Sequence, residues 1–257
     1  MTATVPIVTT DYGGSGQDVL LLHGGGRTRH DWDAFAPLLR ARGYRPVAMD
    51  LRGHGDSGSG PWSWPSVLAD LDSVAEELGA PIVIGHSLGG MVAALWAGEH
   101  PECPLAVNVD GHGNPTRPDQ YLGLDEVARA HAYLDMTAFF AQASEVLPGS
   151  MVQVMREVDA LDLMAVYRAA RCPLLVLSGG DHEWVRQVLP EHLVPAWEAY
   201  RAWTAEQLAA VMRDQPLVSV ASLPTGHDVH RQDPAGLLRI VLAHLGTRSG
   251  PGTSKQA

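Results

Sequence analysis

The sequence predicts an α/β protein whose mostly parallel sheet is covered by helices on both faces. Short apolar runs rich in Val, Leu and Ile alternate with segments in which apolar residues recur at helical spacing, and such alternation is typical of strand–helix–strand units. The chain has 257 residues, of which 46% are hydrophobic and 18% are charged. It is therefore long enough and apolar enough to bury a substantial core.

Each predicted strand is a short apolar run, and each predicted helix has an apolar face. The strands are expected at residues 19–22, 45–50, 81–85, 105–109, 174–177 and 218–223. The helices are expected at residues 31–42, 65–78, 88–100 and 234–245. Gly43 and Gly79 follow two of these helices, where glycine commonly ends a helix.

Two segments depart from simple strand–helix alternation. Residues 112–170 contain no convincing strand, but they carry helical patterns around 124–133, 137–146 and 151–170. An all-helical insertion of this length predicts a cap over one edge of the sheet, and residues 182–213 form a smaller helical excursion. The expected parts are a core of residues 1–111 and 171–246, a helical cap of residues 112–170 and a disordered tail of residues 247–257.

The charge balance excludes several classes of partner. Lys and Arg number 18 against 29 Asp and Glu, which gives a formal charge of −11. A surface this acidic repels nucleic-acid phosphates and anionic lipids, so neither nucleic acid nor a membrane is expected as a partner. No apolar run approaches the roughly eighteen residues that a membrane span requires, and residues 1–6 lack the features of a secretory signal. These observations predict a cytoplasmic protein.

Two cysteines are too few for a disulfide framework. Cys103 and Cys172 each precede a Pro-Leu pair at the start of consecutive predicted strands. If those strands are parallel neighbours, the two sulfurs lie close together. A strand spacing of about 4.8 Å permits a disulfide without favouring one, so we expect reduced thiols.

The strongest chemical signal is Gly-His-Ser-Leu-Gly at residues 85–89, between a β-branched strand and an Ala-rich helix. A sharp strand-to-helix turn holds the central serine in a strained conformation with its hydroxyl exposed. The helix N-terminus that follows directs backbone N–H groups at an anion forming beside that hydroxyl. Ser87 is therefore the predicted nucleophile, and a merely tight turn is the alternative.

A serine hydroxyl needs a general base, and His227 is the predicted one. His227 follows the last predicted strand, and a loop at the end of a strand is a common place for functional residues. His230 is the local rival, but it lies further into a polar segment.

The third member of such a site is a carboxylate that orients the imidazole. Asp181 and Asp110 both lie at the ends of predicted strands, and both fit the chain order Ser, Asp, His. Either carboxylate could instead cap a helix or close a turn. We favour Asp181, because the glycine pair before it frees a loop to reach His227; Asp110 stays the alternative.

Acyl transfer also needs donors for an oxyanion. The glycines of residues 24–26 follow the first central strand and supply mobile backbone at the same edge of the sheet as Ser87. The backbone N–H groups of Gly25 and Leu88 are the predicted pair. A plain flexible turn is the alternative explanation of the glycines.

The motifs together resemble those of the α/β-hydrolase superfamily, in particular its small, cofactor-free serine hydrolases with a helical cap. They are His-Gly-Gly-Gly at 23–26, Asp-Leu-Arg-Gly-His-Gly-Asp-Ser-Gly at 50–58, Gly-His-Ser-Leu-Gly-Gly at 85–90 and Gly-His at 226–227. The resemblance implies an eight-stranded, mostly parallel sheet with the catalytic residues at its C-terminal edge and a cap after the sixth strand.

The resemblance also bears on the choice of residues. In most members the acid follows the strand after the cap, which supports Asp181, while in some it follows one strand earlier, at the position of Asp110. Relatives that open epoxides or remove halide carry aspartate at the position of Ser87, so the serine argues against both reactions. Residues 178–181, Ser-Gly-Gly-Asp, depart slightly from the usual Gly-x-x-Asp.

Apolar side chains of the predicted cap are candidates for a substrate pocket, with core packing as the alternative. These candidates are Met136, Phe139, Phe140 and Met155. His112 could line the pocket, assist proton transfer or be a simple loop residue. A metal set drawn from Asp110, His112, Asp181, His182 and His227 lacks compact ligand spacing, and no metal is expected.

Residues and resemblance together predict a serine hydrolase that cleaves a carboxylic ester, a lactone or a thioester through an acyl-enzyme. The expected partner is a small-molecule substrate, and no cofactor is expected. The same triad could instead serve a carbon–carbon bond hydrolase, a perhydrolase or an acyltransferase, and a non-catalytic ligand-binding protein is the further alternative. The sequence leaves the oligomeric state open.

Overall fold

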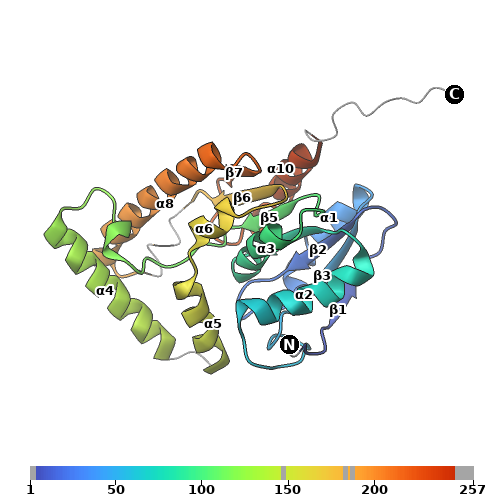
Figure 1. Ribbon diagram of the computed structural model, residues 1–257, viewed down its shortest axis with the longest axis horizontal. Coiled ribbons are helices and arrows are strands. Elements are labelled where there is room, and N and C mark those ends of the chain that lie inside the picture. The colour runs from blue at the N-terminus through green and yellow to red at the C-terminus, as the bar shows by residue number, and fades with distance from the viewer. Residues whose placement is uncertain (1–3, 146–148, 182–184, 186–188, 247–257) are drawn as a thin grey trace.

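The computed structural model describes residues 4–145, 149–181, 185 and 189–246, and its strands form one sheet (Figure 1). The sheet has seven strands in the order β1-β3-β2-β4-β5-β6-β7, and β1 alone is antiparallel to its neighbour. The strands are β1 (Thr9–Asp11), β2 (Asp18–Leu22), β3 (Arg45–Met49), β4 (Ile82–His86), β5 (Ala106–Val109), β6 (Leu174–Gly179) and β7 (Val218–Leu223). The predicted mostly parallel sheet is confirmed, with seven strands in the described part of the chain rather than eight.

Helices connect the strands. They are η1 (Arg29–Trp32), α1 (Ala36–Ala41), α2 (Trp64–Leu78), α3 (Leu88–Glu99), η2 (Pro118–Gln120), α4 (Glu126–Glu145), α5 (Gly149–Ala160), α6 (Leu163–Arg168), η3 (Glu191–Leu193), α8 (Val194–Asp214), α9 (Val229–Gln232) and α10 (Pro234–Gly246). None of the helices in the described residues combines the length and the hydropathy needed to cross a membrane. The predicted tail at 247–257 lies outside the described residues.

Both faces of the sheet are covered because its central strands are apolar throughout. In β2, Leu20 and Leu22 face the cluster that contains α2, α3 and α6, while Val19 and Leu21 face the cluster that contains α1 and α10. All four side chains are fully buried. Because both faces of the strand are buried, its sequence is continuously apolar and does not alternate between apolar and polar residues.

A separate apolar cluster joins α4 to α8, which lie beyond the sheet on the side opposite β1 (Figure 1). Tyr121 and Met136 contribute from the segment between β5 and β6, and Trp197 and Tyr200 contribute from α8. The layer above this edge of the sheet is therefore built from two segments of the chain that are separated by β6.

The apolar pattern at 151–170, predicted as one helix, is divided between α5 and α6. Asp162 interrupts it, and its side chain accepts a hydrogen bond from the Ala165 N–H as the N-cap of α6. The helix thus restarts at Leu163 as α6, and Leu163 and Tyr167 pack into the cluster around α3.

Cys103 and Cys172 lie just before the neighbouring parallel strands β5 and β6. Both are buried thiols in this structure. The Cys103 thiol donates to the Pro81 carbonyl at 3.4 Å, and the Cys172 thiol donates to the Pro173 carbonyl at 3.6 Å. The expectation that the two strands are parallel neighbours is confirmed.

Candidate active site

The turn between β4 and α3 holds Ser87 in a strained backbone conformation. Its φ is 51° and its ψ is −114°, and only Asp110 shares a positive φ with it among the non-glycine residues that the structure describes. The Ser87 N–H donates to the Val109 carbonyl at 2.9 Å, and its carbonyl accepts from the Met91 N–H at 3.1 Å. These bonds fix the residue where the strand ends and the helix begins, as a nucleophile at such a turn requires.

The glycines around Ser87 are required because the backbone approaches itself closely. A Cβ atom on Gly85 would lie 1.9 Å from the Gly89 carbonyl oxygen, and one on Gly89 would lie 2.5 Å from the Leu22 carbonyl oxygen. Both obstacles are backbone atoms of the central sheet and its helix, which cannot move aside. The spacing of the motif therefore follows from the packing of α3 on β2 and β4.

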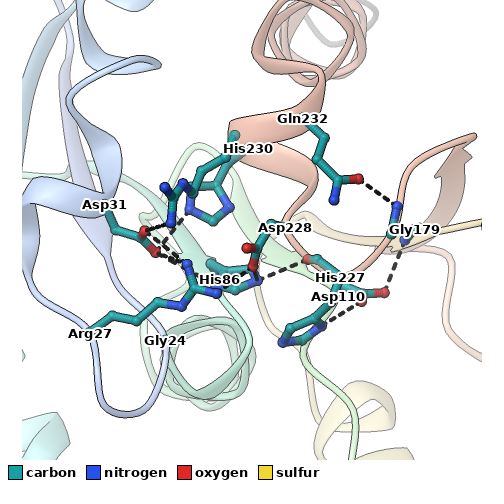
Figure 2. A network of polar contacts seen from close by, with 12 residues as sticks. Gly24, Arg27, Asp31, His86, Asp110, Gly179, His227, Asp228, His230 and Gln232 are labelled. Atoms are coloured by element: carbon teal, nitrogen blue, oxygen red, sulfur yellow. Dashed lines mark hydrogen bonds and ion pairs between the residues drawn. The ribbon is translucent and has the colours of Figure 1, made fainter. Parts of the chain in front are cut away.

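His227 lies in the loop after β7, and its imidazole meets the carboxylate of Asp110 (Figure 2). His227 Nδ1 is 2.7 Å from Asp110 Oδ2, and Asp110 Oδ1 accepts from the Gly179 N–H at 3.0 Å. Burial raises the pKa of Asp110, but the hydrogen bonds to His227 and to the Gly179 N–H outweigh burial, so the net pKa lies below its ordinary value. Asp110 is therefore an ionised acceptor suited to holding an imidazole.

A side chain on β5 explains how Asp110 reaches this position. The buried amide of Asn108 accepts from the Gly111 N–H at 2.8 Å and donates to the Gly111 carbonyl at 2.9 Å. Its amide nitrogen is also 2.8 Å from the Tyr167 hydroxyl. This closed turn gives Asp110 its φ of 51° and directs its carboxylate toward the loop that carries His227.

We therefore propose Asp110, the alternative, in place of Asp181 as the orienting acid. Asp181 lies on the exposed loop after β6, and its N–H donates to the Thr225 carbonyl at 2.9 Å. The hydrogen-bond position at His227 Nδ1 is taken by Asp110. The sequence signal that distinguishes the two carboxylates is Asn108, a buried amide two residues before Asp110 that closes its turn.

Backbone hydrogen bonds join these residues in one row across the sheet edge. Ser87 donates to the residue before Asp110, Asp110 N–H donates to the Leu177 carbonyl at 2.7 Å, and Gly180 N–H donates to the Leu223 carbonyl at 2.6 Å. The spacing of β4, β5, β6 and β7 thereby determines the relative positions of the residues at their ends.

A partly buried polar network surrounds His86, the residue before Ser87 in the chain (Figure 2). Arg27 donates to Asp31 at 3.0 Å and to Asp228 at 2.6 Å, and His230 Nε2 is 2.9 Å from Asp31. Burial above all, followed by the charges of His230 and His227, lowers the pKa of His86 to about 3.

The neutral His86 contacts the loop of the proposed base directly. Its Nε2 lies 3.0 Å from the His227 carbonyl oxygen and donates to it. Gln232 Oε1 accepts from the Gly226 N–H at 2.7 Å on the other side of the same loop (Figure 2). The backbone of His227 is thus held from both sides while its ring faces Asp110.

His23 orders the glycine loop opposite Ser87. Its Nδ1 donates to the Gly24 carbonyl at 2.7 Å, and its Nε2 accepts from the Leu51 N–H at 3.0 Å. A Cβ atom on Gly25 would lie 3.8 Å from Leu88 Cδ2, so the two residues predicted to supply the oxyanion donors are neighbours. Both residues line the cavity that contains Ser87.

The buried His23 predicts that acid destabilises the fold. Burial lowers the pKa of His23 to about 4, whereas in the unfolded chain it is about 6.5. Between these values the unfolded state binds a proton that the folded state excludes, so the free energy of unfolding falls as the pH drops from 6.5 to 4. At 1.36 kcal/mol for each pKa unit, His23 alone contributes a loss of about 3 kcal/mol. Urea denaturation at pH 7, 5.5 and 4.5 measures this.

The variant His23→Gln keeps an acceptor for the Leu51 N–H and removes the titrating group. It should flatten the dependence of unfolding free energy on pH. His30→Gln is the matched control, since the side chain of His30 is 57% exposed and its replacement should leave the slope unchanged. An equal slope in wild type and His23→Gln would contradict the prediction.

Ser87 and His227 line one cavity of about 300 Å³, roofed by apolar side chains. Phe139 and Phe140 of α4 and Met155 of α5 are among the lining residues, together with His112 after β5. Lining residues that the sequence did not indicate include Val154, Leu189 and Trp197.

Met136 was predicted to line the pocket and instead packs between α4 and α8. It is fully buried in the cluster with Trp197. Met136 lies about one helical turn before Phe139 and Phe140, so on α4 it faces α8 while the cavity is reached by the residues that follow.

Two groups of side chains have ligand atoms within 4.8 Å of one another, Asp110 with His112 and His227, and Asp31 with His86 and His230. The separation of 2.7 Å between His227 and Asp110 is that of a hydrogen bond. In the second group, Arg27 donates to Asp31 at 3.0 Å and its charge opposes a cation. In each group one pair is hydrogen-bonded, His227 with Asp110 and His230 with Asp31. His182, a member of the set considered from sequence, lies outside the described residues.

A serine between a central parallel strand and a helix, followed along the chain by an acid and then a histidine, defines the α/β-hydrolase class. A family model described as "Alpha/beta hydrolase family" matches residues 19–240. The chain belongs to this family.

Named relatives match only part of the chain. The pyrethroid hydrolase of Sphingobium wenxiniae is 40% identical over 91 residues, which are 33% of this chain and 32% of that protein. The pimeloyl-(acyl-carrier protein) methyl ester esterase of Neisseria meningitidis serogroup C is 42% identical over 86 residues, 33% of this chain and 32% of that one. The chain thus spans about a third of the length of these curated relatives.

Solved structures extend the likeness to the whole fold. The enol-lactonase from Burkholderia xenovorans LB400 has a TM-score of 0.66 at 17% identity, over 94% of this chain and 97% of that chain. At this identity the likeness concerns the fold alone.

Proposed function

We propose that this protein is a serine hydrolase that cleaves a carboxylic ester, a lactone or a thioester through an acyl-enzyme. Ser87 is the nucleophile, His227 is the general base and Asp110 orients His227. The N–H groups of Gly25 and Leu88 bind the oxyanion.

The observation that carries the proposal is the hydrogen bond of 2.7 Å between His227 and Asp110, made by a histidine that shares a cavity with the strained Ser87. A structural role alone would not require a serine at φ 51° at the edge of a cavity, because such strain persists only where the surroundings enforce it. The names of the relatives, a pyrethroid hydrolase and a methyl ester esterase, agree with ester cleavage.

The proposed reaction follows from these positions. Ser87 Oγ attacks the carbonyl carbon while His227 Nε2 takes its proton, and the carboxylate of Asp110 stabilises the imidazolium that forms. The negative charge that develops on the carbonyl oxygen is bound by the two backbone N–H groups, each worth about 3 kcal/mol. His227 then protonates the leaving group, and a water molecule deprotonated by His227 releases the acid.

The cavity indicates the size and polarity of the substrate. Its roof is apolar, with Phe139, Phe140 and Met155, which suits a small-molecule ester or lactone with a hydrocarbon part. At about 300 Å³ it lies at the lower end of the range of pockets that enclose a small ligand.

The test is active-site labelling combined with hydrolysis. A fluorophosphonate should modify one serine, and mass spectrometry should find the adduct on the peptide that contains Ser87. The same preparation should hydrolyse 4-nitrophenyl esters from acetyl to dodecanoyl, or an aromatic lactone. The chain-length optimum would then report the depth of the cavity.

Ser87→Ala should neither be labelled nor hydrolyse these substrates. Ser73→Ala is the matched control, an exposed serine on α2, and it should behave as wild type. A wild-type protein that is not labelled and leaves every ester and the lactone intact would overturn the proposal.

A further inference from the structure

A second cavity of about 480 Å³ adjoins the one that contains Ser87. The two cavities share His112, Asn114, Val158 and Trp197 in their walls. The second cavity is lined by residues of the segment after β5 and of helix α8, and Arg201 is one of them. A substrate with its reacting carbonyl at Ser87 can therefore extend past His112 and Trp197 toward Arg201.

Arg201 carries a charge that is not paired with any carboxylate of the described residues. It is partly buried on α8, and within the described part of the chain its guanidinium has neither an ion pair within 4.0 Å nor a hydrogen bond. Burial lowers its pKa, and the charge of Asp110 offsets this only in part. Arginine pairs readily with carboxylates through two parallel hydrogen bonds.

The carboxylates that line the same cavity are engaged elsewhere. Asp110 accepts from His227 and Gly179. Asp159 accepts from the Asn114 amide at 3.0 Å. The third, Asp162, caps α6. Arg117, the other arginine of the lining, is exposed and lies 3.4 Å from Asp119. Arg201 is therefore the cation in this lining that has no anionic partner among the described residues.

Two polar atoms in the shared wall are also available to a ligand. His112 Nε2 and Trp197 Nε1 are buried and have no hydrogen-bond partner among the residues that the structure describes. His112 Nδ1 lies 3.2 Å from the Gly113 carbonyl and donates to it, and burial lowers the pKa of His112. The neutral ring thus offers an acceptor at Nε2 while Trp197 offers a donor. Buried polar atoms of this kind are costly unless a partner is supplied.

We propose that the second cavity binds a carboxylate group of the substrate at Arg201. The substrates would be esters, lactones or thioesters that carry a free carboxylate remote from the scissile bond, such as half-esters of dicarboxylic acids. This inference rests on the proposed function for its reaction, and it adds the substrate class. A single arginine without an ion pair matches one carboxylate rather than a polyanion, which the three aspartates of the lining would repel.

Steady-state kinetics test the proposal with matched pairs of substrates. The mono-4-nitrophenyl ester of adipic acid carries the carboxylate, and 4-nitrophenyl hexanoate is the neutral ester of the same chain length. Arg201→Leu should lower kcat/KM for the adipate ester about 10- to 100-fold, mainly through KM, because a hydrogen-bonded charge pair is lost. The hexanoate ester should change by less than about threefold. Arg213→Leu, an exposed arginine at the end of the same helix, should leave both rates unchanged.

A binding measurement separates this inference from the proposed function. Calorimetry on Ser87→Ala with monomethyl adipate, which this variant should not cleave, should give a dissociation constant about 10- to 100-fold lower than that of Ser87→Ala/Arg201→Leu. Dimethyl adipate should bind both variants equally. Equal binding of monomethyl adipate would overturn the carboxylate site even if wild type cleaves neutral esters. A difference in binding with no hydrolysis of any ester would retain the carboxylate site and overturn the proposed reaction.

Discussion

Asp110→Asn is expected to lower kcat/KM for ester hydrolysis about 10⁴-fold with little change in fold. The carboxylate accepts from His227 Nδ1 at 2.7 Å and from the Gly179 N–H at 3.0 Å. An amide can keep the second bond, but its NH₂ group then faces Nδ1 and favours the tautomer that carries its proton on Nε2. That tautomer cannot take the proton of Ser87. Steady-state hydrolysis of a 4-nitrophenyl ester measures kcat/KM, and a circular dichroism spectrum shows whether the fold is retained.

Asp181→Asn is the matched control, since Asp181 is the other aspartate at a strand end that the sequence offered for this role. The kcat/KM of Asp181→Asn for ester hydrolysis should stay within about threefold of wild type. The reverse outcome, with full activity in Asp110→Asn and a large loss in Asp181→Asn, would return the role of the acid to Asp181.

Gly89→Ala is expected to prevent the chain from reaching its native fold. The new Cβ would lie 2.5 Å from the Leu22 carbonyl oxygen and 2.7 Å from the His23 carbonyl oxygen. Since both atoms belong to the central strand β2 and its continuation, relief would require α3 to move away from the sheet. We expect a loss of about 4 kcal/mol or more, the size that marks steric disruption of a core. Soluble yield and urea denaturation measure it.

Gly149→Ala is the control for the same chemical change. A Cβ at Gly149, the first residue of α5, meets nothing within 4 Å. This variant should be as stable as wild type or slightly more stable, because alanine favours helix. A Gly89→Ala protein with wild-type stability would mean that α3 packs on β2 less closely than the structure has it.

Most of the sheet could be predicted because its strands are apolar on both faces. Each predicted strand overlaps an observed one, and β2 and β4 are buried along almost their whole length. The strand β1, Thr-Thr-Asp at Thr9–Asp11, was missed because it is an edge strand of polar residues with mostly exposed side chains. β1 pairs with β3, but the residues of β1 carry no apolar pattern from which this pairing could be predicted.

The candidate site was predictable where one short motif fixes the geometry. The turn at Ser87 follows from its flanking glycines, which admit only one packing of strand and helix. The choice between Asp110 and Asp181 depends on a contact between residues 117 positions apart, and both aspartates end strands. Only the buried amide of Asn108 hinted at a preference, since a polar group inside a sheet needs partners nearby.

Arg201 was beyond sequence reasoning for a related reason. Its helix places charged residues between apolar ones, and an arginine in such a helix is usually solvated. Arg201 is unusual because no carboxylate of the described residues forms an ion pair with it. Whether a partner lies within reach depends on how α4, α5 and α8 pack, which one sequence does not reveal. The role of Met136 was uncertain from sequence in the same way, because the face of α4 that meets α8 could not be assigned from one chain.

The row of backbone hydrogen bonds across the ends of β4, β5, β6 and β7 has an evolutionary consequence. The groups proposed for bond cleavage are spaced by the pleated backbone itself, while the walls that would recognise a substrate belong to α4, α5 and α8. Substitutions in these helices can alter which molecule is accepted without shifting the atoms that react with it. Selection can therefore change the substrate of such a protein while its chemistry is inherited unchanged.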